Sequence, residues 1–175
     1  MSRPRDRLIL PHEVEAICGQ LGYMDGIPIE TLQQQIAAGF LLALETAMRA
    51  GEIFGLEWQR VQLRRRFVRL ADSKNGDGRD VPLSARAVQL LEMMKGVDRD
   101  RVFTVDSQVA STLFRRARVR AKIGDLTFHD SRHDAITRLA RKLPVMDLAR
   151  MVGHRDIRSL MIYYNATAES IAALL

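Results

Sequence analysis

Residues 128–164 read FHDSRHDAITRLARKLPVMDLARMVGHRDIRSLMIYY, and this stretch carries the most informative pattern in the chain. Apolar residues recur at helical spacing from 135 to 140, and Pro144 begins another short helix. One more helix is expected over residues 156–164. The stretch therefore predicts a run of short helices joined by turns.

The same stretch collects residues that bind anions and move protons: His129, Arg132, His154 and Tyr163. His129 and Arg132 lie three positions apart at the start of a helix, so both can project toward a common anion. A tyrosine hydroxyl titrates near 10 and becomes a useful nucleophile only beside cations or a base. Taken singly, each residue also has an ordinary explanation as part of a solvated helix face or a half-buried core.

Upstream, the spacing of apolar residues predicts a helix opened by Pro11 and a longer one over residues 31–48, capped by Thr31. Arg49 falls where that longer helix is expected to end, and a short helix with Ile53 and Phe54 facing inward follows it. Alternating residues around the turn SKNGDGRD then predict a β-hairpin.

Two further helices are expected after the hairpin, one capped by Ser84 and one by Ser107. Lys74 lies at the edge of the predicted hairpin. The pattern as a whole predicts an α+β fold, a mostly helical single domain with a small antiparallel β-sheet.

The charge of the chain narrows the class of partner. Its 175 residues carry a net charge of +6, and of 27 basic residues 23 are arginine and only four are lysine. Arginine favours planar, bidentate contacts to phosphates. Charge alone does not separate a nucleic-acid-binding protein from one that is merely basic and soluble.

Several classes are disfavoured by what the sequence lacks. Cys18 is the only cysteine, which excludes an intrachain disulfide and a thiolate metal cluster and favours a small buried side chain. No apolar run approaches the roughly 20 residues that span a bilayer, and the N-terminus lacks the apolar stretch of a signal peptide. We expect a cytoplasmic protein, associated with the nucleoid, that has no contact with a membrane.

Four segments in order now support a resemblance: TAMRAGEIFGLEW, DSKNGDGRDVPLS, LTFHDSRHDAITRLA and MVGHRDIRSLMIYY. They resemble the successive signature boxes of the tyrosine recombinases, the phage-integrase family, over residues 30 to 165. The resemblance implies cleavage of one DNA strand at a time through a 3′-phosphotyrosyl intermediate that frees a 5′-hydroxyl. It implies no metal and no cofactor.

Carried over by position, the resemblance makes Tyr163 the nucleophile. Arg49 and Arg132 match the two catalytic arginines, Lys74 the lysine of the hairpin, His129 the histidine before the second arginine, and His154 the later histidine. Glu52 matches an acidic residue that helps to hold the site, and His133 is expected to point away from His129 and Arg132 in a supporting role. Tyr164 follows Tyr163 directly, but adjacent helical residues point about 100 degrees apart, so only one of them can meet a phosphate.

Chemistry assigns roles to these residues. Two guanidiniums can offer paired donors to the oxygens of an attacked phosphate. Lys74 is the expected acid for the leaving 5′-oxygen, His129 the expected acceptor of the tyrosine proton, and His154 a donor to the phosphate. The basic runs are expected to contact the DNA backbone at Arg64, Arg65, Arg66, Arg115, Arg116 and Arg118.

The expected organisation is a catalytic domain over residues 1–164 and a C-terminal tail over residues 165–175, which packs on its own domain or is exchanged between protomers. The N-terminal domain usual in the family is not expected in this chain, which then acts as part of a longer recombinase. We expect a homotetramer on double-stranded DNA and a monomer or weak dimer without it. The alternatives are a type IB topoisomerase and a catalytically silent DNA-binding relative. The boxes do not identify a DNA target.

Overall fold

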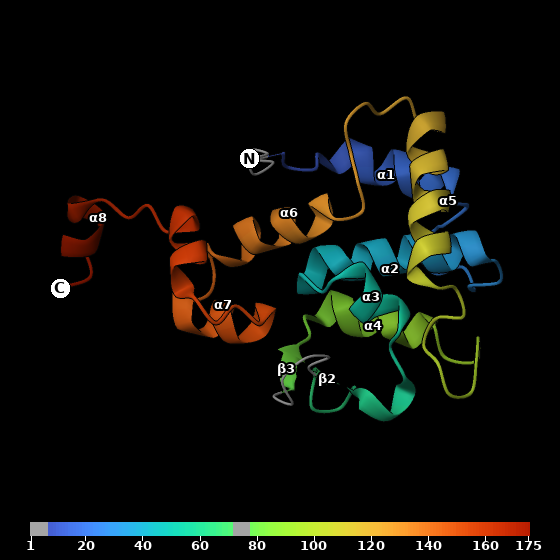
Figure 1. Ribbon diagram of the computed structural model, residues 1–175, viewed down its shortest axis with the longest axis horizontal. Helices are drawn as coiled ribbons and strands as arrows, with labels where there is room; N and C mark the ends of the chain where they lie inside the picture. Colours follow the sequence, from blue (N-terminus) through green and yellow to red (C-terminus); the bar gives the residue numbers. More distant parts are fainter. Residues whose placement is uncertain (1–6, 72–77) are drawn as a thin grey trace.

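The computed structural model describes residues 7–71 and 78–175, and it consists mostly of helices around one small sheet (Figure 1). The helices are α1 (Pro11–Gln20), α2 (Leu32–Thr46), α3 (Ala50–Phe54), α4 (Ala85–Met93), α5 (Ser107–Arg120), α6 (Asp130–Leu139), α7 (Val145–Val152) and α8 (Ala168–Ala172), with 3-10 helices η1 (Trp58–Arg60) and η2 (Ile157–Tyr163). The strands are β1 (Val61–Gln62), β2 (Phe67–Leu70) and β3 (Arg79–Pro82). The predicted α+β class is confirmed.

The helix starts follow the capping chemistry of the sequence. The Thr31 hydroxyl accepts a hydrogen bond from the backbone of Gln34 at 3.1 Å, and the Gln34 side-chain oxygen accepts one from the backbone of Thr31, which completes a capping box. Ser84 caps α4 as predicted. The predicted cap of α5 was wrong by one residue, because the carboxylate of Asp106 accepts from two backbone N–H groups and Ser107 becomes the first residue of the helix.

The sheet contains the predicted hairpin and one strand more. β2 and β3 pair antiparallel with Val68 opposite Val81, and both of these side chains are fully buried. The short β1 adds a third strand, in the order β1-β2-β3. Lys74, predicted at the edge of the hairpin, lies outside the described residues. A helix was predicted over residues 156–164, and residues Ile157–Tyr163 of this stretch form the tighter 3-10 helix η2.

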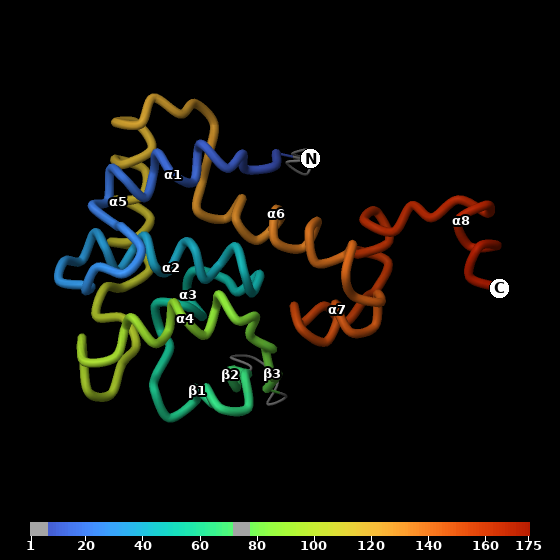
Figure 2. The backbone as a smooth tube through the Cα atoms, turned by 180° about the vertical axis from the view of Figure 1, so that it is seen from behind, coloured from blue at the N-terminus to red at the C-terminus, as the bar shows by residue number. Residues whose placement is uncertain are grey.

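Two apolar clusters divide the interior. The larger cluster contains side chains from the five helices α1 through α5 and from the sheet. It includes the packed rings of Phe40, Phe54, Phe103, Phe114 and Phe128. The smaller cluster is built by α6, α7 and η2, which lie together on the side of the molecule away from α5 (Figure 2). Ala47, just beyond α2, belongs to this smaller cluster. Arg132 and His154 meet between the end of α2, which belongs to the larger cluster, and the end of α7, which belongs to the smaller one.

The chain after η2 leaves the body of the molecule. α8 stands apart from the other helices, with the C-terminus beyond it (Figure 1), and every residue from 165 onward is exposed. Its apolar side chains are uncovered, Leu174 being 85% exposed. Within the described ranges, no helix has the length and apolar character needed to cross a membrane.

Candidate active site

Arg132 lies at the junction of three elements. Its side chain leaves α6, is only 5% exposed, and donates from Nη1 to the carbonyl of Ala47 at 2.5 Å and from Nη2 to the carbonyl of Val152 at 3.0 Å. These carbonyls stand at the C-terminal ends of α2 and α7, where backbone oxygens lack helical partners and carry partial negative charge. Two helix ends therefore fix the position of one guanidinium.

Burial makes this guanidinium unusual. It lowers the pKa of Arg132 to about 10, and the neighbouring charges of Arg49 and Arg79 act in the same direction, whereas Glu52 and Tyr163 oppose them. Arg132 therefore remains charged at neutral pH. Three of its five N–H groups are used by Ala47, Val152 and His154, so two remain for an anion.

His154 completes this side of the site. Its Nε2 lies 3.1 Å from Nη2 of Arg132 and its Nδ1 lies 2.8 Å from the hydroxyl of Ser159. Burial, and then the charge of Arg132, lowers the pKa of His154, which favours the neutral ring. Since arginine can only donate, we assign the proton to Nδ1 and the accepting lone pair to Nε2.

Arg49 lies across from Arg132 at the start of a helix, not at the end of one as the sequence predicted. α2 stops at Thr46 because Ala47 adopts the left-handed conformation with φ 57°, and Arg49 then becomes the N-cap of α3. The Arg49 side chain is 48% exposed and one of its Nη atoms lies 3.3 Å from Glu52. Much of this guanidinium is therefore accessible to a ligand.

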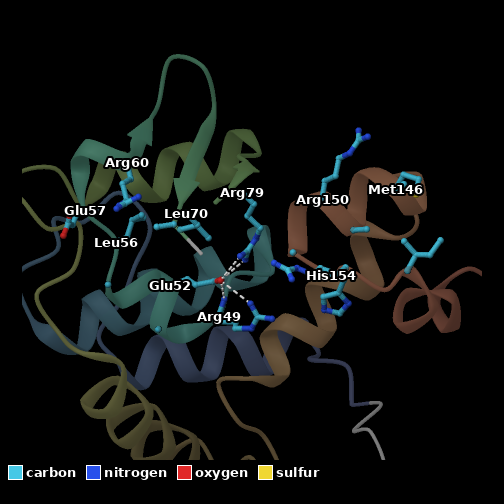
Figure 3. Close-up of a pocket in the computed structure, with 17 residues that line it drawn as sticks. Arg49, Glu52, Leu56, Glu57, Arg60, Leu70, Arg79, Met146, Arg150 and His154 are labelled. Carbon is cyan, nitrogen blue, oxygen red and sulfur yellow. Dashed lines mark hydrogen bonds and ion pairs between the residues drawn. The ribbon is translucent and has the colours of Figure 1, made fainter. Parts of the chain in front are cut away.

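Glu52 holds the site together through an arginine that the sequence argument missed. Its carboxylate receives two hydrogen bonds of 2.9 Å from Arg79 and one of 2.8 Å from the backbone of Arg49 (Figure 3). Arg79 also donates from Nε to the carbonyl of Met151 at 3.0 Å, so it joins β3 to α3 and α7. Burial alone would raise the pKa of Glu52, but its bonds to Arg79 and Arg49 outweigh burial and lower it. The sequence did contain a clue to this role, because Arg79 lies within the box DSKNGDGRDVPLS.

A groove of about 1100 Å³ opens beside these residues. Arg60 lies on one of its walls, near the sheet, and Arg150 on the other, on α7 (Figure 3). Arginines dominate its polar lining, which comprises Arg49, Glu52, Glu57, Arg60, Arg79, Arg150, His154 and Arg155. Arg49 and Arg79 bond to the Glu52 carboxylate, and Arg132 lies close enough for that carboxylate to favour its charged form. Three positive charges against one negative charge leave an excess of two for an anion to neutralise.

The two tyrosines separate as the sequence argument required. Tyr163, the last residue of η2, has its hydroxyl 2.8 Å from Nδ1 of His133, and its charge favours the charged form of Arg132. Tyr164 turns the other way and donates to the carbonyl of Leu143 at 2.6 Å. His133 was expected to point away from His129 and Arg132 in a supporting role; the structure places its ring against Tyr163, because η2 packs on α6.

The other predicted residues are more dispersed. His129 is exposed at the N-cap of α6 and its side chain makes no capping hydrogen bond. Residues 64–66 form the exposed turn between β1 and β2, where Arg65 packs over the ring of Phe67 at 5.0 Å. Arg115, Arg116 and Arg118 lie on α5, far from α7 in both views (Figures 1 and 2). Their contact with DNA stays a prediction.

Among residues 7–71 and 78–175, no group of three or more His, Cys, Asp or Glu side chains is arranged to hold a metal ion. The polar lining of the groove is instead dominated by guanidiniums, which are donors and cannot coordinate a cation. The chemistry that these residues favour is therefore the binding of an anion.

Comparison with known proteins identifies the class to which this fold and site belong. Residues 8–170 match the model of the phage integrase family, and the chain belongs to that family. A Haemophilus influenzae protein named only provisionally as an integrase/recombinase is 38% identical over 176 residues, covering 99% of this chain and 57% of that protein. The shufflon-specific DNA recombinase of Escherichia coli is 42% identical over 138 residues, covering 78% of this chain and 36% of the relative.

Solved structures agree on the fold. The catalytic domain of bacteriophage HP1 integrase superposes with a TM-score of 0.71 at 18% identity, covering 95% of this chain and 91% of that domain. Since the chain spans only about half, or less, of the curated relatives' own length, those relatives carry a region that this chain does not match. The fold and family are therefore established for the matched region.

Proposed function

We propose that this chain is the catalytic part of a site-specific DNA recombinase, which breaks and rejoins DNA strands without a metal through a 3′-phosphotyrosyl intermediate. The observation that carries the proposal is an arginine-rich groove lined by Arg49 and His154, with Arg132 bonded to His154 and Tyr163 close enough for its charge to affect Arg132. Family membership and the name of the shufflon-specific DNA recombinase support it.

The charge of the site suits phosphoryl transfer. As the tyrosine oxygen attacks, the phosphodiester gains a second negative charge, and the local excess of two positive charges matches the dianion. Arg49 offers an accessible guanidinium and Arg132 two remaining N–H groups. Arginines in such reactions contribute on the order of 10³-fold or more in rate, about 4 kcal/mol, so loss of either should be severe.

His154 has a role that depends on its tautomer. In the assigned tautomer its Nε2 accepts from Arg132, so the ring orients that guanidinium before DNA binds. If Nε2 becomes protonated when DNA binds, the same atom can donate to a phosphate oxygen, as the sequence argument expected. Lys74 remains the proposed acid for the leaving 5′-oxygen.

The proposed partner is double-stranded DNA, whose backbone would follow the arginine-lined groove. Arg60 and Arg150 on opposite walls are better placed near the reacting phosphate than the arginines of α5. Binding should weaken steeply with salt, since each phosphate neutralised by arginine releases counterions. Association with DNA would place the protein at the nucleoid.

The proposed assembly on DNA is a homotetramer that exchanges α8 between protomers, with a monomer or weak dimer in its absence. The support is that α8 stands apart from its own domain and exposes Ile171, Leu174 and Leu175. Light scattering with and without DNA measures the change. A deletion of residues 168–175 should leave strand cleavage intact and prevent the tetramer.

The decisive experiment traps the covalent intermediate. The protein is incubated in EDTA with a pool of nicked duplexes that carry a randomised segment, and adducts are separated on a denaturing gel and sequenced. Tyr163→Phe should abolish the adduct, while Tyr164→Phe, which loses only its bond to Leu143, should keep it. An adduct that survives in Tyr163→Phe contradicts the nucleophile.

The captured sequences also separate the rival activity. Duplexes built from them should yield recombinant products when two are mixed. Relaxation of a supercoiled plasmid by a single protomer, with no recombinant product, would instead indicate a topoisomerase.

A further inference from the structure

The proposed nucleophile Tyr163 is in hydrogen-bonding contact with a basic group, the ring of His133. The hydroxyl lies 2.8 Å from Nδ1 of His133, and the two rings are 5.6 Å apart at an angle of 51°. A candidate base has to lie within about 2.6–3.2 Å of the proton that it takes. His133 meets this condition without any movement of the chain.

The contact follows from how α6 is placed. His133 comes directly after Arg132, and consecutive residues on a helix point about 100 degrees apart. Arg132 therefore reaches the ends of α2 and α7, while His133 faces η2. Tyr163 is held there because its ring packs against the smaller apolar cluster, which α6, α7 and η2 share. One helix thus presents adjacent residues to the phosphate and to the nucleophile.

The other histidines near the site are less suited to the task. His154 is engaged on both ring nitrogens, by Arg132 and by Ser159. His129 is exposed at the start of α6, a full turn before His133. The sequence argument assigned the tyrosine proton to His129, whereas the geometry of the side chains favours His133.

We propose that His133 is the catalytic residue that accepts the hydroxyl proton of Tyr163, a role that rests on the proposed function above. The proton passes from the hydroxyl to Nδ1 as the tyrosine oxygen bonds to phosphorus and the bond from phosphorus to the 5′-oxygen breaks. The 5′-oxygen takes its proton from a separate acid, for which Lys74 is the candidate. On rejoining, a 5′-hydroxyl gives its proton back to that separate group and its oxygen bonds to phosphorus. The phosphotyrosyl bond breaks, and the imidazolium of His133 returns the proton to Tyr163.

Substitution at His133 distinguishes proton transfer from simple positioning. In His133→Asn the amide oxygen stands close to where Nδ1 was, so the hydroxyl of Tyr163 keeps an acceptor that is not basic. Single-turnover adduct formation on nicked duplexes should slow by about 10²-fold or more in both His133→Asn and His133→Ala. Added imidazole should restore part of the rate in His133→Ala, because it can occupy the vacated space and take the proton.

A modified substrate separates the base from the acid. A duplex with sulfur in place of the bridging 5′-oxygen has a leaving group that needs no proton. Lys74→Ala should recover on this duplex, and His133→Ala should not. His12→Ala, on the exposed side of α1, serves as the matched control and should react like the wild type on both substrates.

The possible outcomes are distinct. If the wild type reacts and His133→Asn reacts equally fast, His133 only positions the hydroxyl and the proposed role is wrong. Recovery of His133→Ala on the sulfur duplex would also overturn it, because the residue would then serve the leaving group. If the wild type forms no adduct on any duplex, the proposed function itself fails. Thermal melts of each variant confirm that it is folded before its rate is compared.

Discussion

Replacing Glu52 by glutamine should lower the free energy of unfolding by about 3 kcal/mol. The carboxylate accepts two bonds of 2.9 Å from Arg79 and one from the backbone of Arg49, and the two side chains of the ion pair are only 21% and 19% exposed. Removing one partner of a fully buried pair costs roughly 3–5 kcal/mol, and partial exposure places this pair at the lower end. In a chain of this size that loss lowers the melting temperature by about 6–12 °C.

The sheet itself offers a matched control. Arg69 on β2 and Asp80 on β3 form an ion pair of the same bidentate geometry, with bonds of 2.8 and 2.9 Å, but these side chains are 65% and 47% exposed. Water screens such a pair, so Asp80→Asn should shift the unfolding midpoint far less than Glu52→Gln. Urea unfolding followed by circular dichroism measures both variants under identical conditions.

The pH dependence provides an independent check on the cause. The bonds to Arg79 and Arg49 hold the pKa of Glu52 below its ordinary value of 4.5. Its stabilising effect is therefore complete above that ordinary value and is lost as the pH falls through the lowered one. The difference in stability between the wild type and Glu52→Gln should disappear in acid. Equal losses in Glu52→Gln and Asp80→Asn, or a difference that persists at low pH, would refute the reasoning.

Three further predictions concern other parts of the molecule. Gly153→Ala should destabilise the protein by about 1–2 kcal/mol in urea unfolding, since Gly153 has φ +72° and an added Cβ would lie 3.0 Å from the Arg79 side chain; an unchanged midpoint would contradict this. Sulfate should raise the melting temperature more in the wild type than in Arg132→Met, while the exposed control Arg141→Met keeps the full rise; equal rises in all three would argue against an anion site at Arg132. Burial raises the pKa of Cys18 to about 12, so a thiol reagent should modify it only at the rate of unfolding, and rapid labelling of the folded protein would show that it is accessible.

Local chemistry made much of the fold predictable from the sequence. The starts of α1, α2 and α4 depend on Pro11, Thr31 and Ser84, whose effects extend only three or four residues along the chain. The hairpin was predictable for the same reason, from alternation and turn residues. The error at the start of α5 is also local, because Asp106 caps that helix and the predicted Ser107 is its first residue.

The arrangement within the site was harder to predict, because it depends on packing between distant segments. His133 and Tyr163 are thirty residues apart, and Arg79 is 72 residues from the Met151 carbonyl that it binds. Nothing in the local sequence says which face of α6 will meet η2. The resemblance supplied the residue types, but it did not indicate that His133 contacts the tyrosine or that Arg79 anchors Glu52.

The backbone conformation of Ala47 links two features of the fold. Ala47 adopts the left-handed conformation that glycine favours, with φ 57°. That conformation ends α2 and aims the Ala47 carbonyl at Arg132. Alanine accepts the backbone strain because its methyl group is buried in the smaller cluster. One residue, Ala47, therefore both ends α2 and provides the carbonyl that holds Arg132.

The position of the site between the two apolar clusters explains why arginine, and not lysine, serves there. Arg132 leaves α6 and must bond to the ends of α2 and α7 at once while it keeps donors for an anion, which requires several N–H groups in a fixed plane. Arg79 similarly satisfies Glu52 and Met151 together. A lysine has three donors on one atom and could not span these partners. Arg132 and Arg79 thus join the two clusters. Together with Arg49 they create the excess positive charge that a phosphate would neutralise.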